Sequence, residues 1–299
     1  MSSAYKTRSG GELLVVATPL GNLGDLSPRA RESLGRADAI LAEDTRRAGL
    51  LLAACGLGGK RLISLHEHNE EARLPLALQE LAQGRTLALI SDAGTPLLAD
   101  PGYKLVRACR SAGHKVSPLP GPCAALAALA ASGLPPQPFV FLGFPPRKAG
   151  DQQRFFTPFA ALPLTLIFFE RKDRLRATLE RLHVMGGQRE ICLARELTKT
   201  YEEFIFFTLG DFSAFPQELL GEITVVAGPP AKLDKPAPDA QDIAFCHNLP
   251  LKPRAKARLL REQNPGLSAD ESYRLMVRTE SGAAQPVQPA SGGKRSGRT

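Results

Sequence analysis

Short apolar segments alternate with helical patterns in the first part of the chain, and this alternation restricts the fold more than any other feature. The strand-like segments are residues 12–17, 37–42, 85–91 and 115–119. Helical patterns follow them at residues 27–35, 46–54, 102–112 and 123–132. A strand followed by a helix, repeated several times, is typical of βαβ units around a parallel sheet. We therefore predict an α/β fold.

A proline-rich break at residues 133–138 (GLPPQP) ends this alternation, because three prolines forbid a continuing helix. Beyond it, strand patterns recur at residues 139–144, 164–169, 190–194, 202–207 and 222–227, with helical patterns at 151–159 and 173–183. The strands follow one another more closely, which favours a more antiparallel sheet. We predict an N-terminal α/β lobe (11–134), a C-terminal α/β lobe (135–230), a linker with a small helical extension (231–279) and a disordered tail (280–299).

Composition narrows the class of protein. With 43% apolar and 23% charged residues among 299, the chain is too rich in core-forming side chains to be mostly disordered. Its longest apolar runs fall far short of the roughly 20 residues of a membrane span. The five cysteines are scattered and form no C-x-x-C pair, so we expect neither a disulfide framework nor a thiolate zinc site. A soluble protein without a signal peptide, in a reducing cytoplasm, fits best.

Positive charge is concentrated near the C-terminus. Residues 231–299 contain 12 Lys and Arg against 7 Asp and Glu, and the whole chain has a net charge of +8. A basic segment attracts polyanions by releasing their counterions, so nucleic acid is a plausible partner. A solvated tail that only improves solubility is the alternative.

Glycine- and proline-rich loops follow three of the predicted strands, at residues 18–25, 91–103 and 118–123. In α/β sheets such loops bind ligands, and glycine lets the backbone approach a ligand closely. The chain has no G-x-G-x-x-G opening a helix after the first strand, no P-loop and no G-x-S-x-G elbow, which disfavours dinucleotide oxidoreductases, P-loop NTPases and α/β-hydrolases. His66 and His68 lack a third ligand at the usual spacing, so no metal site is predicted.

Six motifs in this order resemble the tetrapyrrole methylase superfamily. They are TPLGNLGD (18–25), EDTR (43–46), SLHEHNE (64–70), SDAGTPLLADPGY (91–103), LPGP (119–122) and GFPP (143–146), with RELTK (195–199) extending the match. Within the superfamily they are similar to the branch of ribosomal RNA small-subunit methyltransferase I, which methylates the 2′-hydroxyl of a cytidine ribose. The sequence departs from the family in two places. The segment ERKDR (170–174) replaces a Glu-Ser-Pro-x-Arg pattern, and Cys123 replaces a smaller or hydroxyl residue.

The resemblance implies a two-lobe class III methyltransferase that binds S-adenosyl-L-methionine between its lobes. It also implies a homodimer that acts on 16S rRNA or the small ribosomal subunit and makes no use of a membrane. The residues that it assigns to the methyl donor are Pro19, Leu20, Gly21, Asp92, Ala93, Gly94, Thr95, Pro120, Gly121, Cys123, Ala124, Leu142, Phe169, Glu170 and Gly228.

A ribose hydroxyl is a very weak acid, so its methylation needs a base or a cation that stabilises the developing alkoxide. The candidate bases are Asp100, His66 and Glu196. Asp100 has helix capping as an alternative role, and Glu196 has pairing with Arg195. The candidate RNA-binding residues are Arg46, Arg47, His68, Asn69, Arg195, Lys199, Lys252, Arg254, Lys256 and Arg258. The helical extension has a solubilising or dimer-contact role as its alternative.

Two other classes of function stay open on the sequence. One is a methyltransferase acting on a small molecule such as a precorrin, which would need no RNA and no residues 231–299. The other is a non-catalytic rRNA-binding protein, for which the altered 170–174 segment is the only supporting feature.

Overall fold

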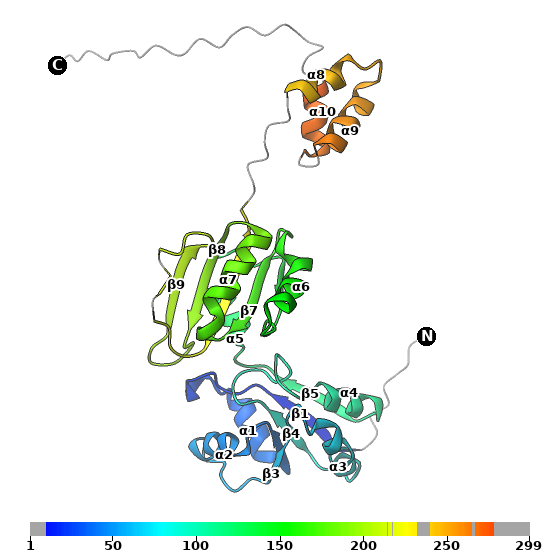
Figure 1. The fold of residues 1–299 in the computed structure, drawn as a ribbon. Coiled ribbons are helices and arrows are strands. Elements are labelled where there is room, and N and C mark those ends of the chain that lie inside the picture. The colour runs from blue at the N-terminus through cyan, green and yellow to red at the C-terminus, as the bar shows by residue number, and fades with distance from the viewer. Residues whose placement is uncertain (1–9, 214, 217, 232–239, 265–266, 278–299) are drawn as a thin grey trace, which may run out of the picture. The chain divides into compact units, whose positions relative to one another are not determined.

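The structure, a computed structural model, describes residues 10–213, 215–216, 218–231, 240–264 and 267–277. The chain divides into two compact units, residues 1–231 and 232–299, and each is described by itself (Figure 1). Residues 232–239 of the predicted linker and the predicted tail at 280–299 lie outside the described residues. None of the described helices has both the length and the apolar character needed to cross a membrane.

The first lobe is built on a five-stranded parallel sheet of strand order β3-β2-β4-β1-β5. Its strands are β1 (Glu12–Val16), β2 (Ala39–Ala42), β3 (Leu62–Ser64), β4 (Leu87–Ile90) and β5 (Lys115–Leu119). Side chains of successive residues point to opposite faces of a sheet, and both faces here are buried. Leu14, Ile40 and Ala88 contribute to one core, whereas their neighbours Leu13, Leu41 and Leu87 contribute to the other.

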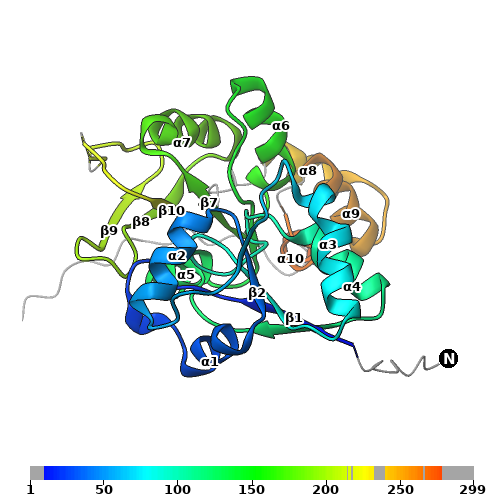
Figure 2. The same ribbon diagram turned by 90° about the horizontal axis from the view of Figure 1, so that it is seen from below.

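Four helices cover these two faces. On one side lie α1 (Pro28–Arg36) and α2 (Thr45–Ala54), and on the other lie α3 (Glu70–Ala82) and α4 (Tyr103–Ser111) (Figure 2). The N-terminus of α1 is capped by Ser27, which accepts from Ala30 N, and that of α2 by Asp44, which accepts from Arg46 N. Because these five strands are parallel, the strand-to-helix connections leave the same edge of the sheet, where the strands have their carboxyl ends.

The second lobe has a mixed sheet of strand order β6-β7-β10-β8-β9. Its strands are β6 (Phe139–Phe141), β7 (Thr165–Glu170), β8 (Arg189–Arg195), β9 (Glu203–Thr208) and β10 (Ile223–Pro230). Only the β6–β7 pair is parallel, and β10 runs antiparallel to both β7 and β8. The start of β10 consequently lies beside the end of β7, with Ile223 opposite Glu170.

Helices also cover both faces of this second sheet. On one face, α6 (Ala149–Ala160) and α7 (Lys172–Gly186) pack around a core that includes Phe156 and Phe168. On the other face lies α5 (Ala124–Ala131), whose Ala128 packs with Ile167 and Val226. The predicted boundary at residue 134 placed α5 with the first lobe, but its alanines pack on the second sheet. The predicted α/β class, with two sheets and C-terminal helices, is confirmed.

The described residues of the second unit form α8 (Ala240–Asn248), α9 (Pro253–Gln263) and α10 (Ala269–Val277). Cys246, Ala257, Leu260 and Met276 are buried between these helices. Lys256 donates from Nζ to the carbonyl of His247 at 2.8 Å, which ties α9 to the end of α8. The unit thus has a small core of its own.

Candidate functional site

Hydrogen bonds join the loops that follow β1, β4 and β5. Thr18 and Gly94 exchange two backbone hydrogen bonds, of 2.8 and 3.0 Å, and Thr95 Oγ1 donates to the carbonyl of Pro122 at 2.8 Å. Gly94 has φ +79°, and an added Cβ would lie 3.0 Å from Leu20 Cδ2. Only glycine adopts that conformation without strain, so the loop closes against Leu20 because residue 94 has no side chain.

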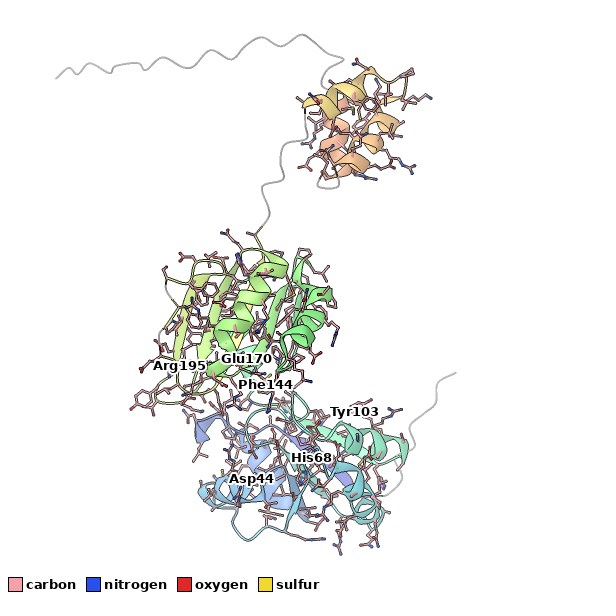
Figure 3. The ribbon with its side chains drawn as sticks, in the orientation of Figure 1. Asp44, His68, Tyr103, Phe144, Glu170 and Arg195 are labelled. Carbon is pink, nitrogen blue, oxygen red and sulfur yellow. The ribbon has the colours of Figure 1, made fainter. Side chains whose placement is uncertain are left out.

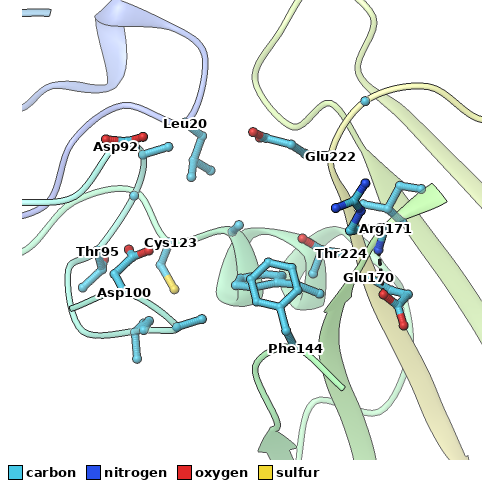
Figure 4. Close-up of a pocket in the computed structure, with 18 of the residues that line it drawn as sticks. Leu20, Asp92, Thr95, Asp100, Cys123, Phe144, Glu170, Arg171, Glu222 and Thr224 are labelled. Carbon is cyan, nitrogen blue, oxygen red and sulfur yellow. Dashed lines mark hydrogen bonds between the residues drawn. The ribbon is translucent and has the colours of Figure 1, made fainter. Parts of the chain in front are cut away.

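A cavity of about 420 Å³ lies where these loops face the second lobe, as the close-up in Figure 4 shows. This volume falls within the range of roughly 300–1,000 Å³ that is usual for small-molecule sites. Asp92 and Asp100 stand on the first-lobe side, and Glu170 and Arg171 stand on the other. In Figure 3, Phe144 and Glu170 lie at the part of the second lobe that faces the first.

Ten of the residues predicted as donor-binding or catalytic line this cavity. They are Leu20, Asp92, Ala93, Gly94, Thr95, Asp100, Cys123, Ala124, Phe169 and Glu170. The first-lobe members come from the loops after β1, β4 and β5, and Ala124 begins α5. The rule that loops at the carboxyl ends of parallel strands bind ligands therefore located one wall of the cavity from sequence.

The other predicted donor-binding residues do not line the cavity. Pro19, Gly21, Pro120 and Gly121 belong to the same loops but are not among the lining residues. A side chain at Gly21 would clash with Lys199, and one at Gly121 would lie 3.0 Å from Ala17 Cβ. Leu142 packs against the core beside α6 and α7. Gly228 lies at the wrong end of β10, because this strand runs antiparallel to β7 and so presents its first residues to the site.

Nine lining residues were not predicted as site residues. They are Glu43, Leu98, Ala99, Phe144, Arg171, Gly221, Glu222, Ile223 and Thr224. Glu43 and Phe144 belong to motifs that carried the family resemblance, so a signal for them was present. The sequence carries no such signal for residues 221–224, because their position at the cavity depends on the direction of β10, which strand patterns do not reveal.

Glu170 is fully buried in the wall of the cavity and uses both carboxylate oxygens within the protein. Oε1 accepts from Arg171 N at 2.8 Å and from the Arg174 guanidinium, and Oε2 accepts from Thr178 Oγ1 at 2.7 Å. The Glu170–Arg174 pair is thus intact despite the altered residues between them. Arg171 lines the cavity, and its guanidinium lies 3.2 Å from Asp173 at an exposed position. The altered segment therefore adds a cation to the site.

Three carboxylates gather on the first-lobe side. Burial is the main cause that raises the pKa of Asp100 to about 6, and the nearby Glu43 and Asp92 charges add to it, while a hydrogen bond from Ser91 opposes it. Burial also raises the pKa of Glu43. Asp92 accepts from Asp44 N at 3.3 Å and pairs with Arg47 at 3.1 Å. The cluster favours a ligand with positive charge.

Glu196 and its neighbours brace the second-lobe wall from outside the cavity. Glu196 Oε1 accepts from Lys199 Nζ and from Glu222 N, both at 3.0 Å, and these bonds lower its pKa. Arg195 donates to Glu203 and to the carbonyl of Leu220, both at 3.0 Å, so it does not pair with Glu196. The predicted base Glu196 is held as an acceptor in a loop contact, away from the cavity.

The loop after β3 has its own internal bonding. Asn69 Oδ1 accepts from His66 N at 2.8 Å, and Asn69 Nδ2 donates to the carbonyl of Ser64 at 3.3 Å. His66 Nδ1 is buried without a hydrogen-bond partner in the described residues, and the rings of His66 and His68 lie 6.1 Å apart. None of these three side chains lines the cavity, and the Asn69 amide serves to close its own loop.

The predicted RNA-binding cations differ in their surroundings. Arg46 pairs with Asp44 at 2.8 Å beside the cavity. In the helical unit, Lys252 precedes α9. Arg254, Arg258 and Arg261 of α9 line a groove together with Tyr273 of α10. Lys256 differs from them, because its ammonium group is turned to α8. The groove thus collects three guanidinium groups from one helix face.

Comparison with known proteins gives one family for most of the chain. The model of the tetrapyrrole (corrin/porphyrin) methylases matches residues 12–213. The ribosomal RNA small subunit methyltransferase I of Escherichia coli O157:H7 is 44% identical over 277 residues, which cover 90% of this chain and 96% of that protein. Both findings confirm the resemblance.

Solved structures show the same fold. The methyltransferase CobJ matches with a TM-score of 0.58 and 22% identity, over 74% of this chain and 95% of that one. The uroporphyrin-III C-methyltransferase of Thermus thermophilus, complexed with S-adenosyl homocysteine, matches with a TM-score of 0.54 and 18% identity, over 73% of this chain and 97% of that one.

Proposed function

Since the chain belongs to the tetrapyrrole methylase family and, within it, to the ribosomal RNA small subunit methyltransferase I group, we propose that it methylates the RNA of the small ribosomal subunit with S-adenosylmethionine as methyl donor. The name of the Escherichia coli relative, which is 44% identical over 96% of its length, supports the RNA substrate over a precorrin. The observation that carries the proposal is the cavity between the lobes.

The residues of this cavity fit the methyl donor. S-adenosylmethionine combines a flat adenine with a sulfonium, an ammonium and a carboxylate. Leu20, Phe144 and Phe169 offer apolar surface for the adenine, and Asp92 and Asp100 offer negative charge for the cations. Arg171 provides a positive charge on the opposite side. The solved relative with S-adenosyl homocysteine supports a donor of this chemistry on this fold.

The donor supplies a methyl group on a positively charged sulfur, and the protein supplies position and a proton acceptor. In the proposed reaction the 2′-oxygen of a cytidine ribose forms a bond to the methyl carbon as the sulfur–carbon bond breaks. The hydroxyl proton passes to the Asp100 carboxylate. A base with a pKa of about 6 is largely ionised at neutral pH, yet more basic than an ordinary aspartate.

Arg46 and Arg47 beside the cavity, and Arg254 and Arg258 in the α9–α10 groove, offer guanidinium groups for RNA phosphates. A homodimer and a cytoplasmic site of action follow from the family and are proposed with it.

The experiment is methyl transfer from labelled S-adenosylmethionine to assembled small subunits purified from cells that lack the gene, followed by mapping of ribose methylation by reverse transcription. We expect label in the RNA, at one cytidine ribose. Label only in protein, or no label despite donor binding, would contradict the proposed substrate. Label on added precorrin in the absence of subunits would instead support the small-molecule alternative.

A further inference from the structure

A second hollow, of about 480 Å³, adjoins the donor cavity on the first lobe. Its lining is entirely polar and consists of Glu43, Asp44, Thr45, Arg46, Arg47, Ser64 and Asp92. These residues come from the end of β3, the loop after β4 and the connection from β2 into α2. Glu43 and Asp92 line the donor cavity as well, so these two carboxylates form a wall between the hollow and the cavity.

The charged groups of the hollow are arranged by ion pairs. Arg47 Nη1 lies 3.1 Å from Asp92 Oδ2, and Arg46 contacts Asp44 through both Nε and Nη2, at 3.2 and 2.8 Å. Both guanidinium groups remain accessible, with side chains 68% and 89% exposed. Each arginine is therefore held in place by a carboxylate and can still contact a ligand from solvent.

We propose that this hollow binds the ribose and phosphate of the target nucleotide, with the sugar placed beside Glu43 so that its hydroxyl meets the methyl donor at the shared wall. The inference rests on the proposed function and deepens it, because it assigns a place to the substrate nucleotide. In this arrangement Arg47 contacts the phosphate, which competes with Asp92 for the guanidinium.

The chemistry of the lining selects this part of a nucleotide. Guanidinium groups bind phosphate oxygens with strong charge-assisted hydrogen bonds. The hydroxyls of Thr45 and Ser64 and the carboxylate of Glu43 are partners for sugar hydroxyls. An adenine or a thioether would find little apolar surface here, whereas Leu20, Phe144 and Phe169 provide one in the donor cavity.

Arg47→Gln tests the phosphate contact, with Arg110→Gln as the matched control. Arg110 is an exposed arginine in the last turn of α4, so it lies at the opposite edge of the parallel sheet and the control makes the same change of charge. For Arg47→Gln we expect about 3- to 10-fold weaker binding of small subunits and a salt dependence reduced by about one counterion. The affinity for S-adenosylmethionine, measured by calorimetry, should stay within about two-fold.

Glu43→Gln tests the sugar contact separately. It should leave the affinity for subunits nearly unchanged and, at saturating donor, lower the single-turnover rate of methyl transfer by about 100-fold or more, the effect usual for a group at the reacting atom. A rate within a few-fold of the unchanged protein would overturn the placement of the sugar.

Arg47→Gln overturns the proposal if it binds subunits like Arg110→Gln, or if it loses affinity for the donor and for subunits equally. If the unchanged protein transfers no methyl group to subunits, the proposed function itself fails. If it does transfer and Arg47→Gln matches it in binding and salt dependence, only the placement of the nucleotide fails.

Discussion

Asp100 lies in the loop between β4 and α4, where burial and the neighbouring Glu43 and Asp92 carboxylates raise its pKa to about 6. Folding therefore works against the ionised form of this side chain, which is the form that accepts a proton. A raised carboxyl pKa of this kind is common at functional sites, because burial and neighbouring negative charges disfavour the ionised carboxylate.

The rate of methyl transfer should rise with pH through about 6, and Asp100→Asn should lower it by about 100-fold or more.

The Asp100→Asn variant should also be more stable than the unchanged protein above pH 6. An aspartate in the unfolded chain has a pKa near roughly 4, so the folded state binds the extra proton between these two values and loses stability as pH rises. Melting temperatures at pH 7.5 and pH 4 measure this, and an equal gain at both would contradict the pKa.

Glu170 and Arg171 are adjacent in sequence and have opposite roles. Glu170→Ala should destabilise the protein by about 3 kcal/mol, because it removes the partner of the largely buried Arg174 guanidinium and of the Thr178 hydroxyl. Arg171→Ser, which restores the family's usual residue type, should change the free energy of unfolding by no more than about 0.5 kcal/mol, since its ion pair is exposed. Urea unfolding measures both. Equal losses would contradict the distinction.

At the scale of elements, the loop after β8 supports the loop before β10. Glu196 and Thr198 have positive φ angles of 51° and 65°, and Gly221 has +89°. Any side chain at Gly221 would clash with Glu196, whose carboxylate accepts from Glu222 N. The strained residues and the close contact together fix the segment that begins β10 at the edge of the donor cavity.

Glu196→Ala should therefore weaken S-adenosylmethionine binding by about 10-fold, as the Gly221–Glu222 segment loses its acceptor. The rate at saturating donor should be nearly unchanged, because Glu196 touches no reacting atom. Glu196→Gln keeps the Oε1 acceptor and should show a smaller effect. Calorimetry and steady-state kinetics separate binding from rate, and a rate loss of about 100-fold in both variants would restore Glu196 as a base.

Sequence patterns located the strands of the first lobe that are strongly apolar, since a parallel sheet buried on both faces leaves continuous apolar runs. They missed α3, which carries Pro75 inside the helix, and α8, which follows a proline-rich segment. For the site, loops at strand ends revealed the first-lobe wall. The second-lobe wall depends on strand direction, which the sequence does not reveal: the sequence predicts Gly228 at this wall, whereas Ile223 and Thr224 line it in the structure.

At the scale of the whole molecule, the helical unit has a core separate from the cores of the two lobes. A chain ending at residue 231 should bind S-adenosylmethionine within about two-fold of the full chain. Its affinity for small subunits should fall by about 10-fold or more, with a shallower salt dependence, because the guanidinium groups of Arg254, Arg258 and Arg261 are lost. Filter binding at several salt concentrations measures this, and equal loss of both affinities would indicate a structural role.

In the proposed function the cavity between the lobes holds the methyl donor, and the roles of the other residues depend on that position. Gly94 lines this cavity, and Gly113 has the same φ of +79° but no atom within 4 Å of an added Cβ. Valine at either position strains the backbone equally, but only Val at residue 94 meets Leu20 in the cavity.

The most direct measurement is a calorimetric titration of S-adenosylmethionine into the unchanged protein, Gly94→Val and Gly113→Val, each checked for folding by circular dichroism. We predict one donor per chain for the unchanged protein and for Gly113→Val, and an affinity at least about 100-fold weaker for folded Gly94→Val. Equal affinity in all three would contradict the placement of the donor in this cavity.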